Sequence, residues 1–208
     1  MKVAVLGGTG RMGGGVARHL AKKHEVIIGS RDPGRAKRAA EKFEGARGAG
    51  YTQAAAESDV VVVAVPYGAL GAMAEVAREV RGKLVVSMVN PLKMERGLLK
   101  FSLEEGSAAE ELAAMLPGGR VATAFNNLPA GFFDGEEVPA ADVLVAAQSS
   151  EVFEEAAEVV RSIPRLRPLY AGPLSEARTV EMITPLVLNL ARLNQMGALA
   201  TKFVTKKG

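Results

Sequence analysis

The chain contains no cysteine and no tryptophan, and only two of its 208 residues are histidine. Without cysteine there is no disulfide, no thiolate nucleophile and no iron–sulfur ligation, and most zinc sites are excluded, so we expect no bound metal. The chain also lacks a strong excess of either charge. Its 26 Lys and Arg nearly balance its 23 Asp and Glu, and the net charge is +3. The small excess suits anionic small ligands. Since the basic residues are scattered, we expect no nucleic-acid partner.

Long apolar runs are missing as well. The longest, residues 60–66, is too short to cross a bilayer. The apolar segment at residues 3–6 ends in glycines and lacks the pattern of a signal peptide. We therefore expect a cytoplasmic protein with no membrane segment.

The sequence does contain a series of short apolar runs separated by helical or loop segments. Near-continuous Val, Ile, Leu and Ala indicates strands buried on both faces, as in a parallel sheet. The alternation predicts an α/β protein with a Rossmann-like, doubly wound, mainly parallel sheet. The expected strands lie at residues 3–6, 25–29, 60–65, 84–88, 121–125, 143–146 and 165–170.

From about residue 173 the pattern changes to a long helical stretch with a broad apolar face. We expect Pro185 to kink or divide this helix, because an interior proline removes a backbone hydrogen bond and clashes with the preceding turn. The predicted division is a dinucleotide-binding domain over residues 1–171 and a small helical domain over residues 172–208. The apolar face is wider than so small a domain can bury. We therefore hypothesise that the chain forms a homodimer through this face.

Residues 7–13 give the strongest clue to what the chain binds. They read Gly-Gly-Thr-Gly-Arg-Met-Gly, directly after an apolar strand and before a helical stretch. This is the arrangement that binds a dinucleotide pyrophosphate, because glycines let the backbone approach the phosphates and the helix N-terminus offers free N–H groups. The alternatives are a purely structural glycine turn and, for the threonine, a helix cap. The expected cofactor contacts are Gly8, Thr9, Gly10, Arg11, Met12 and Gly13.

The end of the second strand bears on the choice between NAD and NADP. An acidic residue there would repel a 2′-phosphate, whereas Ser30 and Arg31 offer hydrogen-bond donors and positive charge, so NADP(H) is favoured. Asp32 before Pro33 reads as a helix N-cap with proline at the first helical position. Arg35, one turn further, either contacts the same phosphate or is an exposed helix residue.

Further strand ends point to the same edge of the sheet. Val65 and Pro66 either redirect the chain across the cofactor or only end a strand. Two exits rich in Asn and Pro, containing Asn90 and Asn126, favour amides that recognise a planar ligand, although Asn can also satisfy a turn by itself. The two histidines, at positions 19 and 24, lie far from these exits, and we interpret them as surface or packing residues.

With these residues assembled, the chain resembles the coenzyme F420-dependent NADP oxidoreductases over nearly its whole length. The resemblance rests on residues 7–13 and 29–31 and above all on 171–175, 184–186 and 196–197. It implies hydride transfer between NADP(H) and the deazaflavin coenzyme F420. It also implies phosphate contacts at Thr9, Ser30, Arg31 and Arg35, and a deazaflavin pocket near Asn126, Leu128 and Leu199. Archaeal members carry histidine at the position of Asn126, whereas related reductases outside the deazaflavin group carry asparagine.

Such a transfer requires the two rings to be stacked at about 3 to 3.5 Å. It needs neither a nucleophile nor an acid–base pair, so we expect no catalytic side chain. The sequence is also compatible with two other functions. One is an NADPH-dependent reductase of a flavin, a ferric chelate or an imine, and the other is a non-catalytic NADP sensor.

Overall fold

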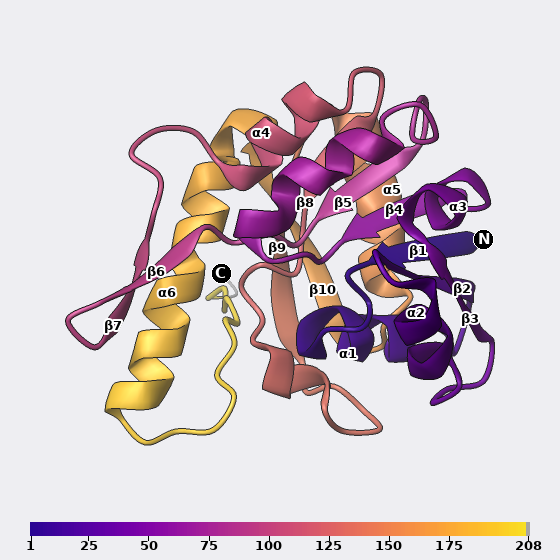
Figure 1. Cartoon of the computed structure of the whole chain (residues 1–208). Helices are drawn as coiled ribbons and strands as arrows, with labels where there is room; N and C mark the ends of the chain where they lie inside the picture. The colour runs from indigo at the N-terminus through magenta and orange to yellow at the C-terminus, as the bar shows by residue number, and fades with distance from the viewer. Residues whose placement is uncertain (207–208) are drawn as a thin grey trace.

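An eight-stranded, mainly parallel sheet runs through the centre of the molecule, in the order β10-β9-β8-β5-β4-β1-β2-β3 (Figure 1). The computed structural model describes residues 1–206. Every predicted strand is present, and the α/β, mainly parallel architecture is confirmed; one pair, β8 with β9, is antiparallel. The strands are β1 (Lys2–Leu6), β2 (Glu25–Ser30), β3 (Ala46–Gly50), β4 (Val60–Val63), β5 (Leu84–Ser87), β8 (Arg120–Thr123), β9 (Ala141–Ala147) and β10 (Leu166–Pro173).

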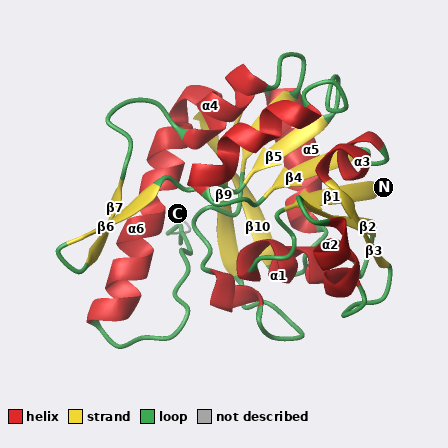
Figure 2. Ribbon diagram, in the orientation of Figure 1, coloured by secondary structure: helices red, strands yellow, loops and turns green. Residues whose placement is uncertain are grey.

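Helices cover both faces of this sheet (Figure 2). Buried residues of α1 (Arg11–Leu20), α2 (Pro33–Ala40) and α5 (Ser150–Arg161) form one core with the strands. On the other face lie α3 (Tyr51–Ala56), η1 (Tyr67–Val76), α4 (Ala108–Met115) and the start of α6 (Ala177–Leu193). Two short 3-10 helices complete the chain, η2 (Ala130–Phe133) and η3 (Leu174–Glu176).

Strand β3 was not predicted, because its sequence, Ala-Arg-Gly-Ala-Gly, has no apolar run. The structure gives the reason for its small residues. A Cβ atom at Gly48 would lie 2.2 Å from the backbone of Ala36, so α2 rests directly on the main chain of this edge strand. Close helix packing therefore replaces the apolar side chains that mark the other strands.

A two-stranded hairpin, β6 (Leu92–Glu95) and β7 (Leu98–Phe101), projects beside α6 and was also not predicted. Its two turn residues, Arg96 and Gly97, both have positive φ, of 47° and 80°. This is the backbone conformation that two-residue hairpin turns require. The side-chain amide of Asn189 in α6 covers the hairpin edge, donating to the Leu99 carbonyl at 2.8 Å and accepting from its N–H at 2.9 Å.

Of the two outcomes expected at Pro185, a division of the C-terminal helix is wrong, because α6 continues through this residue, and a kink stays a prediction. Pro185 is buried together with Glu181, Thr184 and Val187. The boundary between residues 171 and 172 falls inside β10, and the two-domain division stays a prediction.

No helix within residues 1–206 is both long and apolar enough to cross a membrane.

Candidate functional site

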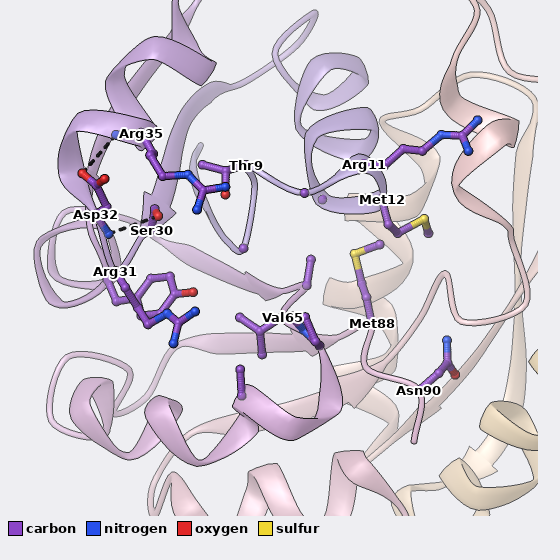
Figure 3. Close-up of a pocket in the computed structure, with 17 residues that line it drawn as sticks. Thr9, Arg11, Met12, Ser30, Arg31, Asp32, Arg35, Val65, Met88 and Asn90 are labelled. Atoms are coloured by element: carbon purple, nitrogen blue, oxygen red, sulfur yellow. Dashed lines mark hydrogen bonds between the residues drawn. The ribbon is translucent and has the colours of Figure 1, made fainter. Parts of the chain in front are cut away.

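A cavity of about 730 Å³ opens at the carboxyl ends of β1 to β5 (Figure 3). Polar residues frame one end of it and apolar residues the other. Most of the residues predicted from strand ends line this one cavity, namely Thr9, Gly10, Arg11, Met12, Gly13, Ser30, Arg31, Arg35, Val65, Pro66 and Asn90.

The glycine turn between β1 and α1 forms the middle of the cavity wall. Gly7 has φ +89°, and a Cβ atom there would lie 2.6 Å from the carbonyl oxygen of Ala64. A Cβ atom at Gly13 would lie 2.6 Å from the Gly7 carbonyl oxygen, so α1 packs against the turn itself. Gly8 faces Val5 and does not line the cavity. Steric demand thus accounts for the glycines at the positions where the backbone comes closest.

The N-terminus of α1 begins at this turn. Its N-cap is Gly10 and no side chain caps it, so the interpretation of Thr9 as the helix cap is wrong. The N–H groups of a first helical turn have no partner within the helix, and the helix dipole adds partial positive charge. An uncapped N-terminus that forms part of a cavity wall suits a phosphate.

At the polar end, Ser30, Arg31 and Arg35 gather after β2 (Figure 3). The prediction that Asp32 caps α2 is confirmed, since its carboxylate accepts the N–H groups of Gly34 at 2.8 Å and Arg35 at 3.2 Å. The Ser30 hydroxyl accepts the Asp32 N–H at 3.2 Å.

Within the described part of the chain, no ion pair engages Arg31 or Arg35. Two guanidinium groups that form no ion pair therefore border the cavity. They provide the positive charge that an additional phosphate would require.

Sequence reasoning missed Tyr51, Ala64 and Met88, which also line the cavity. Tyr51 directly follows β3, so the strand-end rule would have found it if that strand had been recognised. Burial raises the pKa of the Tyr51 hydroxyl, and nearby Arg31 opposes that shift. Ala64 and Met88 were assigned to the strands, which in fact end one residue before each of them.

The apolar end of the cavity contains Met12, Val65 and Met88, with Asn90 beside them. Arg11 turns away from the polar end (Figure 3) and pairs with Asp134 at 2.5 Å, both side chains being mostly exposed. The partner lies far along the sequence, and no local pattern signals such a pair.

Asn90 belongs to a hydrogen-bonded group that joins two strand ends to α6. Its Oδ1 accepts from Asn126 Nδ2 at 3.2 Å, and the Thr184 hydroxyl lies 3.0 Å from the same oxygen and 2.7 Å from the Asn126 carbonyl. Phe125, the residue before Asn126, is buried and has φ 65°. Residues other than glycine rarely adopt this backbone conformation. This rare conformation helps to aim Asn126 inward.

Gly8 and the residues that the resemblance placed near a deazaflavin lie outside the cavity lining. Asn126 is buried, and its amide is engaged by Thr123, Val89 and Asn90. Leu128 is buried in the core, and Leu199 is half-buried in the C-terminal segment. Their contact with a second ring stays a prediction.

The two histidines pack as expected. His19 is buried against Phe133, with ring centroids 5.9 Å apart, and burial lowers its pKa. Burial also lowers the pKa of His24. Within residues 1–206, no three acidic or histidine side chains are grouped so that they could hold a metal ion.

The chain is similar to known proteins in sequence and in structure. Residues 2–91 match the family model described as NADP oxidoreductase, coenzyme F420-dependent. The F420-dependent NADP reductase of Methanothermobacter thermautotrophicus is 39% identical, over 94% of this chain and 91% of that protein. A crystal structure of a putative F420-dependent NADP reductase from Arthrobacter sp. fb24 superposes with a TM-score of 0.85, at 25% identity, over 99% of this chain and 100% of that one.

A more distant likeness links the chain to part of a larger protein. The metalloreductase STEAP3 of Rattus norvegicus is 32% identical over 88% of this chain, but the match spans only 36% of that protein.

Proposed function

The chain belongs to the coenzyme F420-dependent NADP oxidoreductases, and we propose from this premise that it transfers a hydride between NADP(H) and the deazaflavin coenzyme F420. The observation that carries the proposal is a relationship at 39% identity over almost the full length of both chains. The cavity supports it, because its polar end suits a nucleotide phosphate and its apolar end suits a planar ring.

In the proposed binding mode, the pyrophosphate lies on the glycine turn at the N-terminus of α1. The 2′-phosphate lies against Ser30, Arg31 and Arg35, whose guanidinium groups are free of protein ion pairs among the described residues. Asp32 lines the same end of the cavity, but its carboxylate is engaged at the start of α2, where it caps the helix. The residues present therefore fit NADP better than NAD.

At the other end, Met12, Val65 and Met88 exclude water and form a wall for the nicotinamide, while Asn90 offers a polar group beside it. When bound, NADPH would supply a hydride from nicotinamide C4 to C5 of F420, and a ring nitrogen of F420 would take up a proton from solvent. Positioning alone can lower such a barrier by about 7 to 11 kcal/mol, so an apolar wall without an acid–base pair is sufficient.

The test is an anaerobic assay with NADPH and oxidised F420, followed by the loss of the visible absorbance band of F420. Rapid bleaching with NADPH and much slower bleaching with NADH are expected. FMN and a ferric chelate serve as alternative acceptors in parallel reactions. Reduction of either one with no change in F420 would contradict the proposed acceptor, and binding of NADPH without reduction of any acceptor would favour a sensor.

The outer face of α6 supports a proposed homodimer. Large apolar side chains are exposed along it at helical spacing, with Met182 47%, Leu186 57%, Leu190 41% and Leu193 66% exposed. Such a stripe can pair with its own copy across a two-fold axis, which would bury both stripes at once. A cytoplasmic location and the absence of a nucleic-acid partner stay predictions of the sequence.

A further inference from the structure

The C-terminal segment, residues 196–203, returns from the end of α6 to the middle of the molecule (Figure 1). There it covers an open edge of β9. Strand β9 pairs with β8 only at Ala146 and Ala147, so the backbone near its start has no strand partner on that side. The Asp142 N–H donates to the Thr201 carbonyl at 3.0 Å and so finds its partner in the C-terminal segment.

Asn127 ties the same segment to the strand ends of the site. Its Nδ2 donates to the Asp142 carbonyl and to the Thr201 hydroxyl, both at 2.6 Å, while its Oδ1 accepts from the Leu144 N–H at 3.3 Å. The preceding residue is Asn126, which contacts Asn90 at the cavity. The C-terminal segment is thus connected to the cavity wall through adjacent residues.

Asp142 and Arg167 form a clamp on this segment. Asp142 is buried, and its carboxylate accepts from Arg167 Nε at 2.6 Å and Nη2 at 2.8 Å, and from the Phe203 N–H at 2.5 Å. Arg167 Nη2 also donates to the Phe203 carbonyl at 2.7 Å. The Arg167 guanidinium holds the pKa of Asp142 below its usual value, so the acceptor stays charged.

The clamped segment passes close to the cofactor cavity. A Cβ atom at Gly131 would lie 3.4 Å from Ala198 Cβ and 3.4 Å from Nη2 of Arg11. Arg11 lines the cavity, so only Gly131, which has no side chain, lies between Arg11 and the C-terminal segment at this point. Leu199 follows Ala198 directly.

From these contacts we propose that residues 196–203 form a fixed wall on the acceptor side of the site, and that Asp142 and Arg167 are the positioning residues that hold it there. The proposal rests on the proposed function, and the acceptor side is the part of the site beyond the nicotinamide end of the cavity, where Arg11 lies. Neither residue touches a cofactor; each acts by fixing where Ala198 and Leu199 lie.

Two substitutions, each with a matched control, can open the clamp. Phe203→Pro removes the N–H that Asp142 accepts, whereas Phe203→Ala removes the same exposed ring and keeps that N–H. A second pair is Arg167→Met with Arg165→Met as its control, because Arg165 forms only an exposed 3.4 Å pair with Glu137. Steady-state kinetics and amide hydrogen exchange of residues 196–203 are measured for all four variants and the wild type.

In Phe203→Pro and Arg167→Met, the KM for F420 is expected to rise about tenfold while the KM for NADPH changes less than about twofold. Exchange in residues 196–203 accelerates in both, and the two controls match the wild type. A Phe203→Pro variant with the KM for F420 of Phe203→Ala would overturn the positioning role. Equal exchange rates in these two variants would overturn the clamp itself, even without turnover. A wild type that reduces no F420 instead contradicts the proposed function.

Discussion

Arg31 lies at the end of β2 with no protein carboxylate to neutralise it among the described residues. If it contacts the 2′-phosphate, Arg31→Ala weakens NADP binding by about 1.5 to 3 kcal/mol, the typical contribution of a charge-assisted hydrogen bond, and leaves NAD binding nearly unchanged. Titrations of both nucleotides measure this. Arg38→Ala is the matched control, because Arg38 lies on α2 outside the cavity lining. Equal losses for NADP and NAD would show that Arg31 has a structural role.

Glu181 is a fully buried carboxylate that sequence reasoning passed over. From α6 it accepts the N–H groups of Ala108 at 2.9 Å and Ala109 at 3.0 Å, and so caps α4. Burial raises its pKa from 4.5 to about 7, with Glu110 and Glu111 adding to the shift. No local pattern indicates this, because the helix that it caps begins 73 residues away.

The raised pKa of Glu181 predicts how the stability of the protein changes with pH. Between pH 4.5 and 7 the native state keeps a proton that the unfolded chain releases, so the Glu181 contribution is fully present below pH 4.5 and is lost as pH rises through about 7. Over this range the loss is about 3 kcal/mol. Glu181→Gln should therefore gain stability relative to the wild type as pH rises, measured by urea unfolding at each pH. Exposed Glu105→Gln is the control, and parallel pH profiles for wild type and Glu181→Gln would contradict the shift.

At the residue scale, the sequence was informative where chemistry follows a recognisable strand. Ser30, Arg31 and the Asp32 cap were found because the strand before them is strongly apolar. Tyr51 was missed because β3 is not. The sequence predicts a ligand contact at Asn126, and only the fold reveals that Thr123, Val89 and Asn90 engage its amide; the contact itself stays a prediction.

At the scale of elements, the missed features are those that depend on tertiary contact. The hairpin turn at Arg96 and Gly97 lacks the Asn-Gly or Asp-Gly pair that marks such turns in a sequence. Helix α6 continues through the buried Pro185, an outcome that intrinsic helix propensity does not predict. The strands of the central sheet other than β3 were predicted, because burial leaves an apolar run in most of them, and β3 lacks such a run.

The packing of α2 on β3 links an edge strand to the phosphate end of the cavity. Gly48→Ala places a Cβ atom where the backbone of Ala36 lies, so α2 must shift and carry Arg35 with it. We expect a loss of about 1 to 3 kcal/mol in the free energy of unfolding. NADP affinity should also fall, although residue 48 does not line the cavity. Both are measured on purified protein, by urea unfolding and by nucleotide titration.

Gly50→Ala is the control for this substitution. It lies in the same strand, where a new Cβ atom would meet only Pro33, at an ordinary 3.8 Å. If Gly48→Ala matched Gly50→Ala in both stability and NADP affinity, α2 would not be held by its approach to β3.

At the scale of the whole molecule, the exposed apolar stripe on α6 is the surface on which the proposed homodimer can be tested. Leu186 and Leu190 lie one helical turn apart on it and are exposed in the single chain. We expect the wild type to have the mass of a dimer in light scattering at micromolar concentration. The double variant Leu186→Glu/Leu190→Glu should be monomeric, because it brings like charges together across the two-fold axis. Val204→Glu makes the same change at an apolar residue that is 88% exposed outside the stripe, and it should remain dimeric. A monomeric wild type at that concentration would remove α6 as the interface and leave its exposed leucines without an explanation.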